Sequence, residues 1–348
     1  MNRTAQSLTL GTMGLLVAGL FVTAAVHPPQ AGRAAKAEAL LAPGALIAPA
    51  PSWSWTVEDL LPPPGRRPAG MATYAVLVDA FGELGYELDA VATGTAGVPK
   101  LFLAALPPDL AQVPETADRK AIFFRAVLPL VLQVNEEIKV DRAKLLDIRA
   151  RLRASRHVPQ AERRWLADMA ERYETTPGDV DQLVKRVDVI PVSMALAQAA
   201  EESGWGSSRF VREGNALFGQ WTTAADGHQV PQARDDGQTH RVAAFASLLD
   251  STRAYARNLN SHRAYREFRD TRAHFRADGR DLDGFDLAGT LGRYSQRNGD
   301  YVRRIRGLIM VNGLRQLDDA MLDEREIRLG GRGPMALLRR MLPFYPRT

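Results

Sequence analysis

The chain has 348 residues, of which 45% are hydrophobic and 24% are charged, a balance that excludes a wholly disordered protein. It contains no cysteine, which excludes a disulfide framework, a thiol nucleophile and any cysteine-based metal site. The formal net charge of +5 favours an anionic partner, whether nucleic acid, a membrane surface or an acidic wall polymer, and does not choose among them.

The N-terminal segment contains an uncharged apolar run, residues 8–26, preceded by Arg3. A basic start, an apolar run of this length and the small residues VTA at 22–24 are typical of a secretory signal peptide or of an uncleaved signal anchor. We assign residues 1–26 to such a segment in preference to a buried core helix. Residues 27–70 are rich in Ala and Pro and predict a linker, because they cannot bury enough apolar surface to offset chain entropy.

Residues 71–175 predict a helical N-terminal region. Between positions 117 and 153, apolar residues recur at helical spacing, which predicts a long helix. Pro129 lies inside this pattern and predicts a kink or a break, because proline removes a helical hydrogen bond. A second amphipathic helix is expected at 160–173.

Residues 176–317 alternate between helical patterns and one turn-rich stretch. Helices are predicted near 179–187, 191–203, 248–259, 287–295 and 301–313. Between positions 218 and 247, the turn sequences ADG and DDG separate short β-prone pieces, which predicts a hairpin within a helical domain. The basic tail, residues 318–348, is expected to pack on its own domain or to fray, in preference to binding a membrane surface.

Carboxylates are the candidates for chemistry. The six histidines form no HExxH pair, and no GxSxG, P-loop or dinucleotide fingerprint is present. Glu201 and Glu202 end an Ala-rich helical pattern and precede SGWG. A glycosidase needs a carboxylic acid with a raised pKa, and an apolar helix face beside a tryptophan and a glycine turn provides such a half-buried setting. These residues alone are equally compatible with a solvated surface pair.

The blocks AQAAEESGWGSSRF and GNALFGQW resemble the catalytic region of the β-N-acetylglucosaminidase domain of bacterial cell-wall hydrolases, glycoside hydrolase family seventy-three. The resemblance continues through VAAFASLLDSTRAYARNLNSHRAYREFR and YSQRNGDYVRRIRGLI, covers about 71–317, and is closest to the Bax-type branch of Gram-negative proteins. It implies a mainly α fold, in which a lysozyme-like α+β domain at 176–317 carries a small β-hairpin lobe and follows the helical region. It implies no cofactor and no metal.

The resemblance also implies catalytic residues. The family's acid is the Glu immediately before SGWG, which is Glu202 here. The family's tyrosine near the end of the domain corresponds best to Tyr294, with Tyr301 as the neighbouring possibility, although either could be a core aromatic. Some relatives carry a second Glu in the hairpin, where this sequence has only aspartates. Asp236, or Asp235 beside it, is therefore the candidate for positioning water.

A further set of residues is expected to line the substrate cleft. These expected substrate-binding residues are Trp205, Asn215, Phe218, Gly219, Trp221 and Tyr301. The two tryptophans could stack on sugar rings, although Trp205 is equally compatible with a place in the core.

The resemblance thus implies an enzyme that cleaves the β-1,4 glycan strand of peptidoglycan, with no nucleic-acid partner. It implies a periplasmic location, with the chain exported or anchored to the inner membrane by its N-terminal segment. A lytic transglycosylase on the same fold and a non-catalytic wall-binding scaffold are the alternatives. Assistance by the acetamido group of the substrate, or a single acid, is the alternative to a second carboxylate.

Overall fold

The computed structural model describes residues 73–114, 116–222, 228–229, 241–292 and 299–325. Its first helices are α2 (Tyr74–Glu83), α3 (Leu88–Ala92), the short 3-10 helix η4 (Pro108–Gln112), α4 (Ala117–Arg153), α5 (Gln160–Arg172) and α6 (Val180–Arg186). They are followed by α7 (Val192–Ser203), α8 (Arg209–Gly214), α9 (Leu248–Ser261), η5 (Arg263–Tyr265), α10 (Arg266–Ala277), α11 (Gly284–Ala288), η6 (Gly289–Gly292), α12 (Gly299–Val311) and η7 (Leu314–Leu317). The expected mainly α, lysozyme-like class is confirmed.

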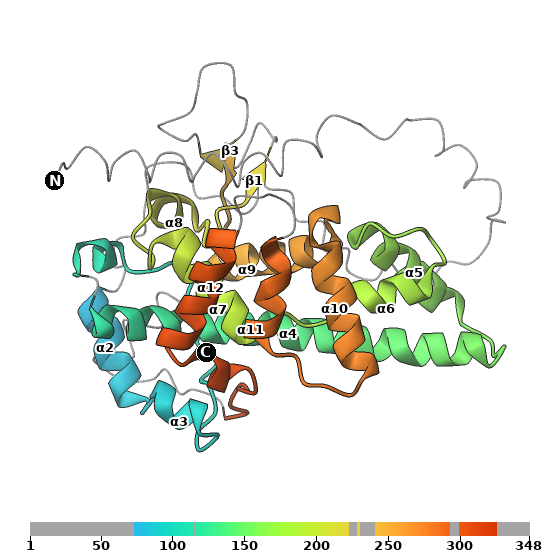
Figure 1. Ribbon diagram of the computed structural model, residues 1–348, viewed down its shortest axis with the longest axis horizontal. Helices are drawn as coiled ribbons and strands as arrows, with labels where there is room; N and C mark the ends of the chain where they lie inside the picture. The colour runs from blue at the N-terminus through green and yellow to red at the C-terminus, as the bar shows by residue number, and fades with distance from the viewer. Residues whose placement is uncertain (1–72, 115, 223–227, 230–240, 293–298, 326–348) are drawn as a thin grey trace, which may run out of the picture.

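The long helix α4 forms the base of the fold and runs along the longest axis of the molecule (Figure 1). It packs against α6, α7 and α9. Of the kink or break expected at Pro129, the break is wrong, because α4 continues through this residue. The neighbouring side chains of Leu128 and Leu130 are completely buried, and their packing offsets the hydrogen bond that proline removes.

Helix α7 lies at the centre of the described structure and contacts α4, α11, α12 and η7. Every residue from Val192 to Ala200 is buried. Four of these nine residues are alanines, whose small side chains let the surrounding helices approach the backbone closely. A helix that is buried on all sides holds its last turn in a fixed position, and that turn carries Glu201 and Glu202.

Three very short strands form an antiparallel sheet in the order β1-β3-β2. They are β1 (Trp221–Thr222), β2 (His228–Gln229) and β3 (Arg241–Ala243). The chain between these strands, residues 223–227 and 230–240, lies outside the described residues. The expected β-hairpin lobe therefore stays a prediction.

Two buried polar side chains fix the start of α7. Asn135 of α4 donates to the carbonyl of Ile190 at 2.8 Å and accepts from its N–H at 3.0 Å, so one amide satisfies both backbone groups. Asp318 accepts from the backbone N–H and the hydroxyl of Ser193 and from the N–H of Gly284. The Asp318 carboxylate thus bonds to the N-terminal ends of both α7 and α11. Its negative charge and its acceptor oxygens stabilise both helix N-termini.

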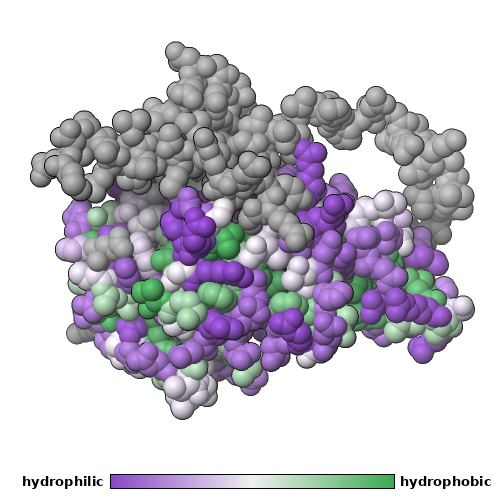
Figure 2. All heavy atoms as spheres, in the orientation of Figure 1, coloured by the Kyte–Doolittle hydropathy of each residue, from purple (hydrophilic) through white to green (hydrophobic). Residues whose placement is uncertain are grey.

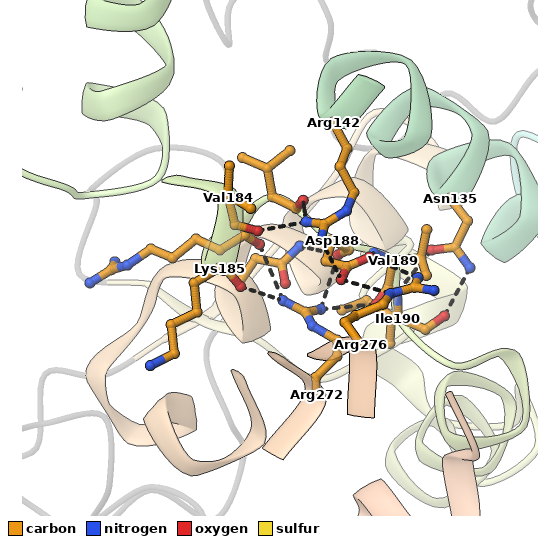
Figure 3. A network of polar contacts seen from close by, with 12 residues as sticks. Asn135, Arg142, Val184, Lys185, Asp188, Val189, Ile190, Arg272 and Arg276 are labelled. Carbon is orange, nitrogen blue, oxygen red and sulfur yellow. Dashed lines mark hydrogen bonds and ion pairs between the residues drawn. The ribbon is translucent and has the colours of Figure 1, made fainter. Parts of the chain in front are cut away.

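The segment that precedes α7 is held by an arginine network (Figure 3). Arg272 of α10 is completely buried and donates to four backbone carbonyls, those of Lys185, Arg186, Asp188 and Val189. Burial alone would raise the pKa of the Asp188 carboxyl. The charges of Arg272, Arg142 and Arg276 outweigh burial and hold that pKa below its usual range.

One hydrophobic core extends across the N-terminal helices and the later ones, from Leu77 to Leu317. The beginning of the C-terminal tail also packs on the fold, since Val98 pairs with the backbone around Leu322. The predicted boundaries 1–26, 27–70, 71–175, 176–317 and 318–348 stay predictions. Most of the tail lies outside the described residues, as do residues 1–72.

The exposed surface in Figure 2 is mostly hydrophilic where it is described, with hydrophobic side chains in small separate areas. Within the described ranges, no helix combines the length and the hydropathy that crossing a membrane requires. The apolar run 8–26 is not among these ranges.

The arginine network leads to a prediction about stability. Replacing Arg272 with Met removes a donor from four backbone carbonyls, of which those of Lys185 and Val189 lose their side-chain donor while those of Asp188 and Arg186 keep another donor. Asp188 also has one cation fewer, so we expect the free energy of unfolding to fall by about 3 kcal/mol. Urea denaturation at constant m-value measures this change. Arg266→Met, at an exposed position on the same helix, is the control and should change stability by less than about 0.5 kcal/mol. Equal stability of the two variants would contradict the role given to Arg272.

Candidate active site

Glu202 lies in the last turn of α7, whose C-terminal end is closed by glycine. Gly204 has φ 56°, the left-handed conformation that suits a glycine cap. Trp205 and Gly206 continue with φ 59° and 77°, so three successive residues are left-handed. The turn predicted from SGWG is present, and it turns the chain sharply away from the carboxylate.

The turn after Glu202 is stabilised by the N-terminal helices. The guanidinium of Arg119 in α4 donates to the carbonyls of Gly204 at 3.0 Å and Trp205 at 3.3 Å. A Cβ atom on Gly206 would lie 2.6 Å from Cδ1 of Leu106 and 3.0 Å from Cδ2 of Leu110, so no larger residue fits there. Residues 106–119 therefore shape the turn beside the candidate acid.

Trp205 is part of the core. Its side chain is only 7% exposed and makes edge contacts with the rings of Phe123 and Phe124 in α4, at 5.9 and 5.2 Å between centroids. Of the two roles considered for this tryptophan, the structure favours packing over sugar stacking. Trp221 begins β1, at the edge of the small sheet.

Among the described residues, the Glu202 carboxyl accepts one hydrogen bond, from the hydroxyl of Tyr301 to Oε1 at 3.0 Å. Burial is the main cause that raises the pKa of this carboxyl to about 7, and the negative charge of Glu201 acts in the same direction. The hydrogen bond from Tyr301 and the positive charge of Arg304 act in the opposite direction. The result is an acid that is still half protonated near neutral pH.

Glu201 has a different environment from its neighbour, as the helical rotation between adjacent residues requires. Its carboxylate forms an ion pair with the guanidinium of Arg304 in α12 at 2.6 Å, and the side chains of the pair are 25% and 34% exposed. The ion pair engages the Glu201 carboxylate. The two carboxylates therefore have different surroundings, and Glu202, whose pKa is raised, is the candidate for a general acid.

Three tyrosines surround Glu202. Tyr255 comes from α9, Tyr265 from η5 and Tyr301 from α12. Burial and the charge of Glu202 raise the pKa of each, so all three hydroxyls stay protonated and can act as donors. Gln198, one turn before Glu202 on α7, connects two of them through its side-chain amide.

The loop from Asn215 to Gly219 lies beside the carboxyl. Asn215 has φ 51° and donates to the carbonyls of Phe245 and Ala246, so its side chain supports the loop. Phe218 stacks on Tyr255 with 3.8 Å between ring centroids and is 7% exposed, which makes it a packing residue. A Cβ atom on Gly219 would lie 3.7 Å from Oε2 of Glu202, so this glycine borders the carboxyl directly.

The structure thus brings together Glu202, Tyr301, Phe218 and Gly219, with Asn215 as support. Tyr294 and Asp236 lie outside the described residues, and so does Asp235. The described tyrosine that contacts the acid is Tyr301, the neighbouring possibility in the sequence.

Sequence reasoning missed Gln198, Tyr255 and Tyr265. Gln198 could have been found, because a residue four positions before Glu202 shares its helix face. The two tyrosines gave no local signal. Among the described residues, no cluster of three or more His, Asp or Glu side chains could hold a metal ion.

Comparison with known proteins identifies the family of the chain. The family described as "Mannosyl-glycoprotein endo-beta-N-acetylglucosaminidase" matches residues 178–312. The chain is 34% identical over 200 residues to "Protein bax" of Escherichia coli (strain K12), an alignment that covers 56% of this chain and 70% of that protein. No solved structure gives a significant match. The chain therefore belongs to the Bax-type glucosaminidase family, whose general chemistry is that of glycoside hydrolases.

Proposed function

We propose that this protein is a peptidoglycan hydrolase, an endo-β-N-acetylglucosaminidase that cleaves the β-1,4 glycan strand with Glu202 as general acid. The observation that carries the proposal is the half-buried Glu202 carboxyl, whose pKa is raised to about 7 and which accepts a hydrogen bond from Tyr301. An acid with this pKa is protonated often enough at neutral pH to protonate the leaving oxygen, and acidic enough to transfer the proton. Family membership supports the glycosidic bond as the target.

The position of Glu202 at the end of α7 supports the same role. The C-terminal end of a helix carries partial negative charge, which disfavours an ionised carboxylate there. Burial, the helix end and the neighbouring charge of Glu201 all favour the protonated acid. The single hydrogen bond from Tyr301 then stabilises the carboxylate that remains after proton transfer.

We propose that the attacking water is activated on the side of the scissile bond opposite Glu202. We propose Asp236, or Asp235 beside it, as the group that positions the water, with Tyr294 as a further residue at the sugar. Assistance by the acetamido group of the substrate is the second route, and it needs only one enzymatic acid. Both routes keep Glu202 as the proton donor.

The substrate is a wall polymer, so we propose that the chain acts in the periplasm, exported or anchored to the inner membrane through residues 8–26. The support for this location is the uncharged apolar run after Arg3, together with the proposed substrate.

The first test replaces the acid. In Glu202→Gln the side chain keeps its shape and loses its proton, so we expect kcat/KM on purified peptidoglycan to fall by about 10² to 10⁴. Binding to the wall, measured by co-sedimentation, should persist. Glu136→Gln, which changes an exposed carboxylate of α4, is the matched control and should cut normally.

Three outcomes separate the possibilities. Undiminished digestion by Glu202→Gln would remove this residue from the mechanism. Products with 1,6-anhydro ends would indicate a lytic transglycosylase, and a wild-type protein that binds the wall without cutting it would indicate a scaffold.

The second test uses pH. The acid must be protonated, so kcat/KM should fall up to tenfold per pH unit above about pH 7. Glu201→Gln removes a negative charge and releases Arg304 from its ion pair, which lowers the pKa of Glu202 and moves this decline to lower pH. Arg304→Gln removes the positive charge and should move the decline to higher pH. Shifts in the same direction for both variants would contradict the electrostatic account.

A further inference from the structure

A chain of hydrogen bonds leads from the core to the acid. The hydroxyl of Tyr255 donates to Oε1 of Gln198 at 2.6 Å. Nε2 of Gln198 donates to the hydroxyl oxygen of Tyr301 at 2.9 Å, and that hydroxyl donates to Oε1 of Glu202 at 3.0 Å. This hydrogen-bond chain joins α9, α7 and α12, which are far apart in sequence.

The glutamine amide gives this chain a direction. An amide oxygen only accepts and an amide nitrogen only donates, so the amide cannot serve both tyrosines in the same way. The Tyr255 hydroxyl is buried and keeps its proton, which requires an acceptor, and Oε1 of Gln198 meets that need. The nitrogen must then face Tyr301, whose single proton is left for Glu202.

We propose that Gln198 is a positioning residue that keeps Tyr301 donating to Oε1 of Glu202 and thereby places the acid's own proton on Oε2. This inference rests on the proposed function, since it concerns the same acid. When Glu202 is protonated, Oε1 is already an acceptor, so the carboxyl proton is on the other oxygen.

The selected oxygen lies on the side of the carboxyl that borders Gly219, a residue without a side chain. A Cβ atom added to this glycine would lie 3.7 Å from Oε2. Oε1 is turned toward Tyr301 and the hydrogen-bond chain behind it. A proton on Oε2 therefore faces away from that chain, whereas a proton on Oε1 would be donated back into it.

A purely structural role explains Gln198 less well. Its side chain is only 6% exposed on a helix whose other core positions are mostly Ala, Leu, Met and Val. Burying an amide costs free energy unless its polar groups are paired, and an apolar residue would fill the position without that cost. Both ends of the amide are paired within the chain that reaches the acid.

Other groups around the acid do not set this direction. The titratable and charged groups that face Glu202 are Glu201 on α7, Tyr255 on α9, Tyr265 on η5, and Tyr301 and Arg304 on α12. Glu201 and Arg304 pair with each other and act on the acid through space. Among the described contacts, only the hydroxyl of Tyr301 reaches Oε1 of Glu202 by a hydrogen bond.

A double-mutant cycle tests the proposal by NMR titration of the ¹³C-labelled Glu202 carboxyl. Gln198→Met keeps the size of the side chain and removes the donor to Tyr301. The hydrogen bond from Tyr301 to Glu202 then weakens, and the pKa of Glu202 rises by about half a unit. In the Tyr301→Phe background the same substitution should cause no further rise, because the effect passes through the Tyr301 hydroxyl. An equal rise in both backgrounds would show a structural role and overturn the proposal.

A second variant reverses the polarity. In Gln198→Glu the introduced carboxylate only accepts, so the Tyr301 hydroxyl turns toward it and away from Glu202. The pKa of Glu202 should rise by more than about one unit, through the lost hydrogen bond and the added charge. At a pH where the acid is fully protonated, kcat should fall by about tenfold with KM unchanged, and Gln198→Met should lower kcat by about twofold. An unchanged kcat in both variants would overturn the proposal.

Gln133→Met is the matched control, because it makes the same chemical change at a hydrogen-bonded glutamine of α4 that pairs with Glu137. It should leave the pKa of Glu202 and kcat unaltered, and thermal unfolding should show that each variant folds. The titration needs no substrate, so it reports on the hydrogen-bond chain even if wall cleavage is not found. Failure of the proposed function and failure of this inference are therefore seen separately.

Discussion

The central constraint on this structure is one carboxyl, that of Glu202, which is held largely out of solvent at the end of a buried helix. Burial raises the pKa of the Glu202 carboxyl from 4.5 to about 7. Above pH 7 this group is ionised in both states, and its ionisation is less favourable in the folded protein than in the unfolded chain. This difference costs about 3 kcal/mol of stability, a large part of a typical domain's total. The cost is absent below about pH 4.5, where the carboxyl is protonated in both states. The packing and hydrogen bonds of the rest of the fold offset this cost.

The support comes from buried polar groups as much as from apolar packing. Asn135, Asp318 and the Arg272 network fix the backbone before and at the start of α7, while alanines let the neighbouring helices close around it. Most of these polar groups are matched to backbone partners, which reduces the penalty of unpaired buried donors and acceptors, although Nε of Arg272 is buried without a hydrogen-bond partner among the described residues. The helix can therefore be central to the core and still end in two carboxylates, those of Glu201 and Glu202.

Sequence periodicity predicted the long helix α4, because its apolar residues recur regularly from Ile122 to Ile138 and pack on one core. It did not predict α8 or α10, and the helix expected at 287–295 is α11 followed by the 3-10 helix η6. The break expected at Pro129 did not occur, since tertiary packing outweighed a local rule. Glu202 was found through its neighbours SGWG. Arg272 was not, because the sequence of α10 is strongly hydrophilic and nothing local distinguishes the one arginine that is completely buried. Gln198 bonds to Tyr255 and Tyr301, which lie 57 and 103 positions later in the sequence. Only the folded chain shows that these residues meet.

The contact between Arg119 and the turn after Glu202 has a consequence for how this protein can be divided. The family match begins at residue 178, yet the guanidinium that holds the carbonyls of Gly204 and Trp205, and the leucines that press on Gly206, come from residues 106–119. The region matched by the family cannot be excised or grafted at residue 178 without losing these contacts. The helices that precede it act as a built-in scaffold, and any minimal version of the protein has to carry them.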